Sequence, residues 1–295
     1  SNRNRCIMMT GTRRGSHTLS QPPSQGVLGS PDYNKATVLR LLAEVTVGRE
    51  RVDSIHAIRT HCRRLQALLE LCGEAKRARE VADGVSRLSR LRALQVFRQY
   101  LIRCDATQKD LTLVDDRVAK QIRKLTRTEA YQKIERVVSK LTLQRIASPL
   151  DVGSRQLDAR RHAHKRQLKE LIVPASDKPR RKRLHALRLA LKTIRYQTEW
   201  LPARTVATHD LLSRLKRVQT ILGRYEELAD FRRWGKTLSR PVQQRITKDW
   251  KRARKRARHV PDTLQWLLDA LASGQVWSVE GLPVTSVHRK STGLV

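Results

Sequence analysis

Two stretches of the chain carry the same row of polar side chains, which starts with a histidine and continues with cations. Residues 56–70, HAIRTHCRRLQALLE, align without a gap with residues 185–199, HALRLALKTIRYQTE. In both stretches the polar residues recur every three or four positions, which places them on one face of a helix. Such a row of cations could hold an extended anion through many charge-assisted hydrogen bonds at once. The first row consists of His56, Arg59, Arg63, Gln66 and Glu70, and the second of His185, Arg188, Lys192, Arg195 and Glu199.

The histidines that head the two rows, His56 and His185, allow three interpretations. Each could be a structural group, a donor to bound phosphate, or a metal ligand. Metal binding has the least support, because no second ligand stands four residues further along and the motif HExxH does not occur. We therefore expect no metal and no other cofactor, and the first two interpretations stay open. Glu70 and Glu199 are expected to orient neighbouring arginines.

Apolar residues run beside each row at helical spacing, so both rows are predicted to lie on amphipathic helices, over residues 51–71 and 180–201. A second pair of similar segments follows them in the same order. LSRLRALQVF at 88–97 aligns with LGRYEELADF at 222–231. Two similar pairs in one order predict two halves of similar build.

The rest of the chain predicts an all-α fold, because no segment alternates with the period of a strand. Further helices are predicted over residues 35–47, 74–103, 107–127, 129–146, 154–173, 209–234, 240–258 and 261–272, and the segments 107–127 and 129–146 form either two helices or one bent helix. The halves are expected at 35–150 and 151–272, with their boundary near 149–153. Residues 1–34 are expected to be a disordered or tag-derived tail, with order beginning near Pro31 and Asp32, which form a helix-start signal. Residues 273–295 are expected to be a second tail, which either packs through Val276, Trp277 and Leu282 or hangs free.

The histidine-headed rows, together with LKRVQTILG at residues 215–223, resemble the CHAD family, the conserved histidine α-helical domains. The resemblance spans about residues 35–272 and implies two four-helix bundles related by pseudo-two-fold symmetry. It also implies a basic central surface that binds inorganic polyphosphate, and association with polyphosphate granules. The residues expected to contact polyphosphate are His56, Arg59, Arg63, Arg64, His185, Arg188, Lys192, Arg195, Lys216 and Arg217. One departure lies in the first half, where Ala93 and Gln95 stand in places that are usually acidic.

Composition also points to a polyanion as the partner. The 295 residues hold 62 Lys and Arg against 27 Asp and Glu, a formal net charge of +35. This excess attracts nucleic acid, anionic membrane or polyphosphate, and composition does not choose among them. No apolar run approaches the roughly 18 residues of a membrane span. Nucleic-acid binding is the leading alternative to polyphosphate binding, and the oligomeric state is left open.

Two further basic runs, at 178–183 and 251–258, have low specificity, since either could contact a polyanion or simply face solvent. We favour the first, because it directly precedes His185 and could extend the second row. The five tryptophans are expected in the core or at helix ends. Base stacking is disfavoured, because the basic rows hold no aromatic residue except Tyr196 at their side.

A polyphosphate-processing enzyme is the second alternative, with little support in the sequence. The chain has no P-loop, nucleophile elbow or Gly-rich dinucleotide turn. Its acidic pairs, Asp115 with Asp116 and Glu226 with Glu227, place adjacent carboxylates on different helix faces. The four cysteines form no CxxC pair and are expected to be reduced in a cytoplasmic protein. The sequence therefore predicts a binding module rather than an enzyme.

Overall fold

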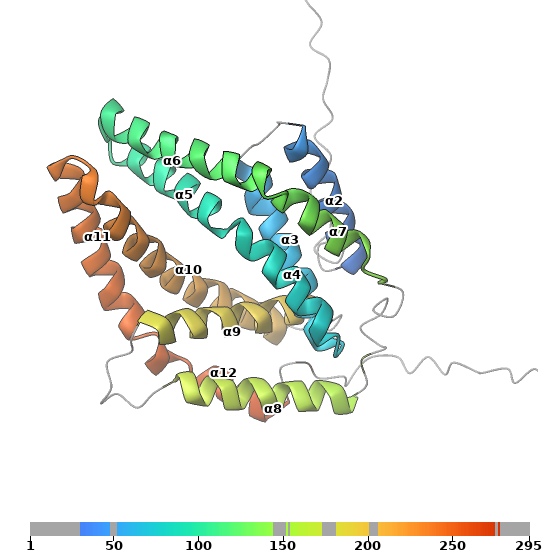
Figure 1. The fold of residues 1–295 in the computed structure, drawn as a ribbon. Helices are drawn as coiled ribbons and strands as arrows, with labels where there is room; N and C mark the ends of the chain where they lie inside the picture. Colours follow the sequence, from blue (N-terminus) through green and yellow to red (C-terminus); the bar gives the residue numbers. More distant parts are fainter. Residues whose placement is uncertain are drawn as a thin grey trace, which may run out of the picture.

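The computed structural model describes residues 30–47, 52–143, 152, 154–172, 181–200, 206–274 and 277, and within these residues the fold is all-α (Figure 1). The prediction of the fold class is confirmed. The first half contains α2 (Pro31–Thr46), α3 (Val52–Leu71), α4 (Ala75–Arg87), α5 (Ser89–Arg103), α6 (Gln108–Arg127) and α7 (Ala130–Ser139). The second half contains α8 (Ser154–Leu171), α9 (Arg181–Trp200), α10 (Val206–Trp234), η3 (Gly235–Thr237), α11 (Arg240–Arg258), η4 (Pro261–Thr263) and α12 (Gln265–Ala272).

Two predicted boundaries were wrong in detail. The segment 74–103 forms two helices, because the chain bends at Leu88, whose N–H bonds to the carbonyl of Val85 rather than one residue further back. The segment 261–272 divides into η4 and α12. At the N-terminus, α2 begins at Pro31, where the sequence places a helix-start signal. Proline suits a first helical turn, where its missing N–H leaves no gap in the hydrogen bonding.

The segment 107–146 was left open between one bent helix and two, and it forms two. Glu129 takes a left-handed backbone conformation (φ 49°) that no α-helix continues through. The chain therefore turns between α6 and α7. The second of these helices ends at Ser139, before the predicted end at residue 146.

The helices that carry the basic rows, α3 and α9, pack against each other and join the two halves. In the first half α3 also packs on α2 and α4, and in the second half α9 packs on α8 and α10. Figure 1 shows α3 between α2 and α4, and α9 between α8 and α10. The pseudo-two-fold relation between the halves stays a prediction. One pair of corresponding residues does meet: Phe97 and Phe231 are fully buried, and their rings stack with centroids 4.7 Å apart.

Two helical hairpins, α5–α6 and α10–α11, are tied together by polar contacts at one end of the molecule (Figure 1). The buried carboxylate of Asp110 accepts hydrogen bonds from the backbone N–H and the hydroxyl of Ser239, at 2.8 and 2.7 Å. Arg117 donates to the carbonyl of Trp234 at 2.9 Å, and the hydroxyl of Tyr100 donates to Asp249 at 2.9 Å. These contacts fix where α11 begins.

Trp277 of the predicted C-terminal tail packs against α8 and α9. Its ring is buried, contacts His164 edge-on with centroids 5.5 Å apart, and donates to the hydroxyl of Thr198 at 3.0 Å. Val276 and Leu282 lie outside the described residues, as does the predicted boundary at 149–153 except for Val152. None of the described helices is long and apolar enough to span a bilayer.

Candidate anion-binding site

The basic rows of α3 and α9 come together because the apolar sides of both helices are buried in the same core. Ile55, Ile58, Cys62 and Leu65 of α3, and Leu187, Leu191 and Ile194 of α9, are at most 1% exposed. This burial fixes the rotation of each helix about its axis and leaves the two rows side by side. The side chains that then influence one another electrostatically, here called the basic cluster, are Arg59, Arg63, Arg92, Arg188, Lys192 and Arg195.

Lys192 lies at the centre of the basic cluster and has the most strongly altered acidity in it. Burial is the largest cause, and the positive charge of neighbouring arginines adds to it, so the pKa of the Lys192 ammonium falls from 10.5 to about 7. The arginines concerned are Arg188, Arg59, Arg195 and Arg63, in order of effect. A lysine in such surroundings gains strongly from any anion that approaches it.

Arg59 is held in place by the α4–α5 bend. Its guanidinium donates to the hydroxyl of Ser89 at 2.7 Å and to the carbonyl of Val85 at 3.2 Å. Burial, followed by the charges of Arg63 and Arg92, lowers the pKa of Arg59 to about 10. Its partners in the fold are neutral groups, so its positive charge is oriented but not cancelled.

Arg63 is fixed along its own helix. It donates to Gln66 at 2.5 Å, and Gln66 in turn donates to Glu70 at 2.7 Å. This chain of bonds aligns the first row, with Glu70 orienting Arg63 through the amide of Gln66. Burial is again the largest reason that the pKa of Arg63 lies below its ordinary value.

In the second half, the corresponding positive charges meet a carboxylate. Glu226 of α10 accepts from Arg188 at 3.3 Å and lies 2.5 Å from Nδ1 of His185. The guanidinium of Arg188 lies flat against Gly223, where a Cβ atom would come within 3.3 Å of it. Glycine at this position therefore leaves room for the arginine.

Arg92 is the cluster residue that was missed from the sequence. In the alignment of 88–97 with 222–231, Arg92 falls on Glu226, so a cation stands where the second half has a carboxylate. Burial is the largest cause of the lowered pKa of His56, and the charge of Arg92 is the next. For Arg59, burial and the charge of Arg63 have larger effects, and the charge of Arg92 lowers the pKa further. The alignment contains this signal: beside the missing acids at Ala93 and Gln95 stands an added cation.

Three nitrogen atoms of the basic cluster are buried without a well-aligned hydrogen-bond acceptor. They are an Nη of Arg92, Nε of Arg188 and Nε of Arg195. The last lies 3.2 Å from Glu199, close enough for an ion pair although not for a well-aligned hydrogen bond. Buried donors nearly always have a partner in folded proteins. These atoms have the charge and the free donor capacity to hold an anion.

The family model of the CHAD domain matches residues 36–235, which is more than half of the chain. The chain belongs to the CHAD family. Among solved structures it is similar to the CHAD domain from the plant Ricinus communis, at 17% identity and a TM-score of 0.49, over 84% of this chain and 91% of that one. It is also similar to PptA from Streptomyces chartreusis, at 16% identity and a TM-score of 0.45, over 85% and 100%. No curated protein matches it in sequence.

Within this CHAD domain, Arg64 has a different place from its neighbours in the sequence. It lies in the joint between α3 and α9, 3.3 Å from Glu199 and with its guanidinium 5.8 Å from the centre of the Tyr196 ring. Arg64 therefore ties the two central helices together. Glu199, which also pairs with Arg195, orients arginines as expected.

The other predicted contact residues are exposed. His56 and His185 lie at the first turns of the two rows, and Lys216 and Arg217 lie on the solvent side of α10. Ligand contact by these four side chains stays a prediction. The buried histidines of this CHAD domain are different ones: His61 pairs with Asn34 at 2.7 Å and His164 with Gln197 at 2.9 Å. Among the described residues, no group of three potential ligands could hold a metal ion.

Proposed function

We propose that the protein binds inorganic polyphosphate, without catalysis, at the basic cluster between α3 and α9. The observation that carries this proposal is the pair of buried guanidinium nitrogens, one on Arg92 and one on Arg188, that lack a hydrogen-bond acceptor among the described residues. The cations come from both halves, and one of them, Lys192, has its pKa lowered to about 7. An anion placed there would accept the free donors and offset the repulsion among the cations.

A phosphate chain fits the cluster better than an isolated anion. Arg59, Arg63 and Gln66 span about 10 Å along α3, at the 1.5 Å rise of a helix, and α9 adds a second row beside them. Several successive phosphate groups are needed to contact cations over that length. A chain of phosphates without sugars or bases is also narrow enough to reach side chains that are only partly exposed.

Binding rather than catalysis is supported by how the nearby carboxylates are engaged. Glu226 is paired with His185 and Arg188, and Glu199 with Arg64 and Arg195. Carboxylates neutralised by arginines are poor ligands for the divalent ion that phosphoryl chemistry requires. The proposal therefore predicts that no orthophosphate appears when polyphosphate is incubated with the protein and Mg²⁺, and sustained release would contradict it. In the cell, this binding would place the protein at polyphosphate granules.

The binding test compares wild type with two variants that lose four positive charges each. The cluster variant carries Arg59→Ala, Arg63→Ala, Arg188→Ala and Lys192→Ala. The α6 control carries Lys109→Ala, Lys120→Ala, Arg123→Ala and Lys124→Ala, all at exposed positions. Long-chain polyphosphate and duplex DNA are titrated against each protein at two salt concentrations, and circular dichroism verifies that both variants fold.

We expect the cluster variant to lose at least about tenfold in polyphosphate affinity and to show a flatter salt dependence, because fewer counterions are released on binding. The α6 control is expected to stay within about threefold of wild type, since screened surface charge acts weakly over a distance. Equal losses in both variants would mean that the affinity comes from net charge alone, and the proposed site would then be wrong.

A further inference from the structure

A second cationic surface lies on α11, beyond the residues matched by the CHAD family model, which end at residue 235. One side of α11 packs on α10 and η3 through Val242, Ile246, Ala253 and Ala257, which are buried. The opposite side faces solvent and holds a line of cations at helical spacing. These residues, here called the α11 surface, are Arg240, Lys248, Lys251, Arg252 and Lys255, and all five are exposed.

The charges of the α11 surface are not compensated within the part of the chain that the structure describes. Asp249 is the one acidic residue of α11. It forms an ion pair with Arg245 at 3.5 Å and accepts a hydrogen bond from the hydroxyl of Tyr100. None of the five cations of the α11 surface has an ion pair with a described residue. By contrast, two members of the favoured run at 178–183 are engaged: Arg181 pairs with Asp230, and Arg183 donates to a backbone carbonyl.

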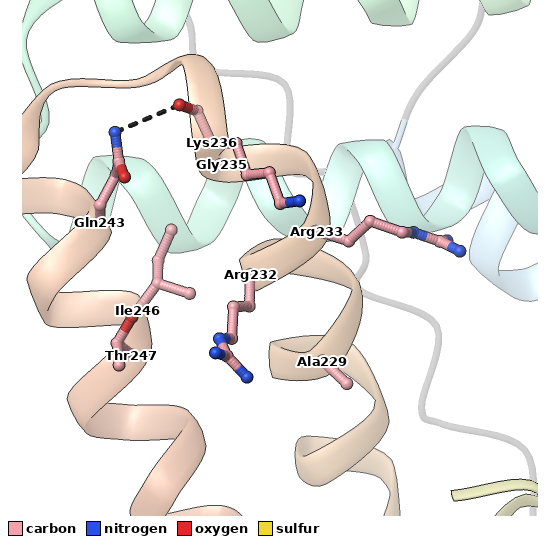
Figure 2. A pocket seen from close by; sticks show the side chains of 8 residues that line it. All are labelled: Ala229, Arg232, Arg233, Gly235, Lys236, Gln243, Ile246 and Thr247. Carbon is pink, nitrogen blue, oxygen red and sulfur yellow. Dashed lines mark hydrogen bonds between the residues drawn. The ribbon is translucent and has the colours of Figure 1, made fainter.

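Two hollows flank the first turns of α11 and share Gln243 and Thr247. One, of about 500 Å³, lies between α10 and α11, and Figure 2 shows Arg232 and Lys236 among the side chains around it. The other, of about 600 Å³, is lined by the α11 surface itself, including Arg240, Lys248 and Lys251. The exposed Gln244 also lines the second hollow and offers an amide that can both donate and accept.

A tryptophan fixes the arginines beside these hollows. The ring of Trp250 has the guanidinium of Arg232 at 4.3 Å from its centre and that of Arg254 at 5.1 Å. Cation–π contacts of this kind hold a guanidinium in one orientation while its N–H groups remain free to donate. The cations at the α10–α11 junction are therefore partly ordered before any ligand arrives.

We propose that the α11 surface binds the phosphate backbone of double-stranded nucleic acid, at a site separate from the basic cluster. From Arg240 to Lys255 the line of cations extends over about 22 Å, at 1.5 Å per residue. A duplex carries one negative charge per about 1.7 Å of its axis, so many phosphates lie along that length. Amide and hydroxyl groups such as Gln244 and Thr247 are common additional partners of phosphates and bases.

Exposure distinguishes the occupants of the two sites. Cations of the basic cluster are partly buried between helices, where a narrow chain of phosphates can reach them and a duplex cannot. The α11 surface is an exposed helix face with its cationic side chains open to solvent, which a broad duplex can approach.

The test uses a full-length α11 variant with Lys248→Ala, Lys251→Ala, Arg252→Ala and Lys255→Ala, beside wild type, the cluster variant and the α6 control. Labelled duplex DNA of about 30 base pairs is titrated against each protein by fluorescence anisotropy over a series of salt concentrations, and polyphosphate is titrated in parallel. All three variants lose four positive charges, so a difference between them reports position rather than net charge.

We expect the α11 variant to lose about tenfold or more in DNA affinity and to lower the salt slope by about 3 to 4, with polyphosphate affinity nearly unchanged. The cluster variant should lose polyphosphate affinity and retain most of its DNA affinity. The proposed function is therefore tested by the cluster variant, and the second site by the α11 variant. The second site is overturned if the α11 variant binds DNA like wild type or no more weakly than the α6 control does. Loss of polyphosphate affinity with unchanged DNA affinity in the α11 variant would also overturn the second site, and would assign the α11 surface to polyphosphate.

Discussion

At the scale of single residues, the two halves differ most where they would be expected to match. Glu226 forms an ion pair with Arg188 and lies 2.5 Å from His185 in the second half, whereas Arg92 adds a positive charge at the aligned position of the first half. The first half therefore presents the stronger positive field to a ligand. Arg92 also carries one of the buried nitrogens without an acceptor.

Reversing the charge of Arg92 should weaken polyphosphate binding more than any single alanine in the cluster. In Arg92→Glu the new carboxylate would pair with Arg59, as Glu226 pairs with Arg188, and would repel phosphate. We expect a loss of about tenfold to a hundredfold, the range of a charged contact worth about 1.5 to 3 kcal/mol. Arg90→Glu, an equal charge change at an exposed position two residues away, is the control and should stay close to wild type.

Polyphosphate affinity should also fall as the pH rises above about 7. The free Lys192 ammonium has its pKa lowered from 10.5 to about 7, and a bound anion raises that pKa again, so binding takes up a proton in alkaline solution. Between about pH 7 and 9 the affinity is expected to drop by up to about tenfold per unit. Lys192→Arg stays charged and should flatten the profile, and an unchanged profile in this variant would exclude Lys192 as the cause.

The same lowered pKa of Lys192 has the opposite consequence for the stability of the ligand-free protein, which should increase with pH. Between about pH 7 and 10.5 the unfolded chain binds the Lys192 proton and the folded chain does not, so the free energy of unfolding rises with pH in this window. Urea titrations at several pH values would measure it. The prediction is that Lys192→Met removes this rise while its stability at pH 6 equals or exceeds that of wild type.

At the scale of elements, the position of α11 depends on one buried carboxylate. Burial by itself would raise the pKa of Asp110, but hydrogen bonds from Ser239 and Thr107 outweigh it and hold that pKa below its ordinary value. Asp110 therefore joins the N-terminus of α6 to the N-terminus of α11, and so ties the first half to the second. The α11 surface is oriented through this contact.

Asp110→Ala is expected to lower the free energy of unfolding by about 1 to 3 kcal/mol, because it leaves the Ser239 donors without a buried acceptor. Since the native pKa is depressed, the contribution of Asp110 is fully present above its unfolded pKa and is lost as the pH falls through the native value. Urea denaturation at pH 7 and pH 3 measures both effects. Lys109→Ala, next to it but exposed, serves as the control, and equal stability of the two variants would contradict the role of Asp110.

At the scale of the whole molecule, the net charge of +35 works against the compact state. Part of that charge lies in the basic cluster at the joint of the halves, and part on the α11 surface at the end of a hairpin. A polyanion bound at the joint contacts both halves at once. Binding should therefore stabilise the fold as a whole and not one element alone.

Long-chain polyphosphate should raise the Tm of the wild-type protein in a concentration-dependent way. A ligand that binds only the folded state at about 100 times its Kd adds about 2.7 kcal/mol to the free energy of unfolding. Differential scanning fluorimetry measures the shift, with orthophosphate at equal phosphate concentration as the control. The cluster variant should show little of this rise, and a rise equal to that of wild type would place the stabilising contacts elsewhere.

The sequence by itself determined the helical fold class, the family and the two basic rows, because period, spacing and repetition are local properties of the chain. The apolar side of each row helix already specified which face would be buried. The alignment of 88–97 with 222–231 likewise places Arg92 at the position of Glu226, but only the folded structure shows that Arg92 belongs to the basic cluster.

Only the tertiary structure decided which cations act together, because that depends on the packing of α3 against α9 and on the turn that brings α5 beside them. Arg64, next to Arg63 in sequence, is directed into the helix joint by a rotation of about 100° along the helix. The depression of the Lys192 pKa likewise arises from burial and from arginines of another helix. Spacing along one chain segment cannot specify either effect, since both depend on distances between segments that folding brings together.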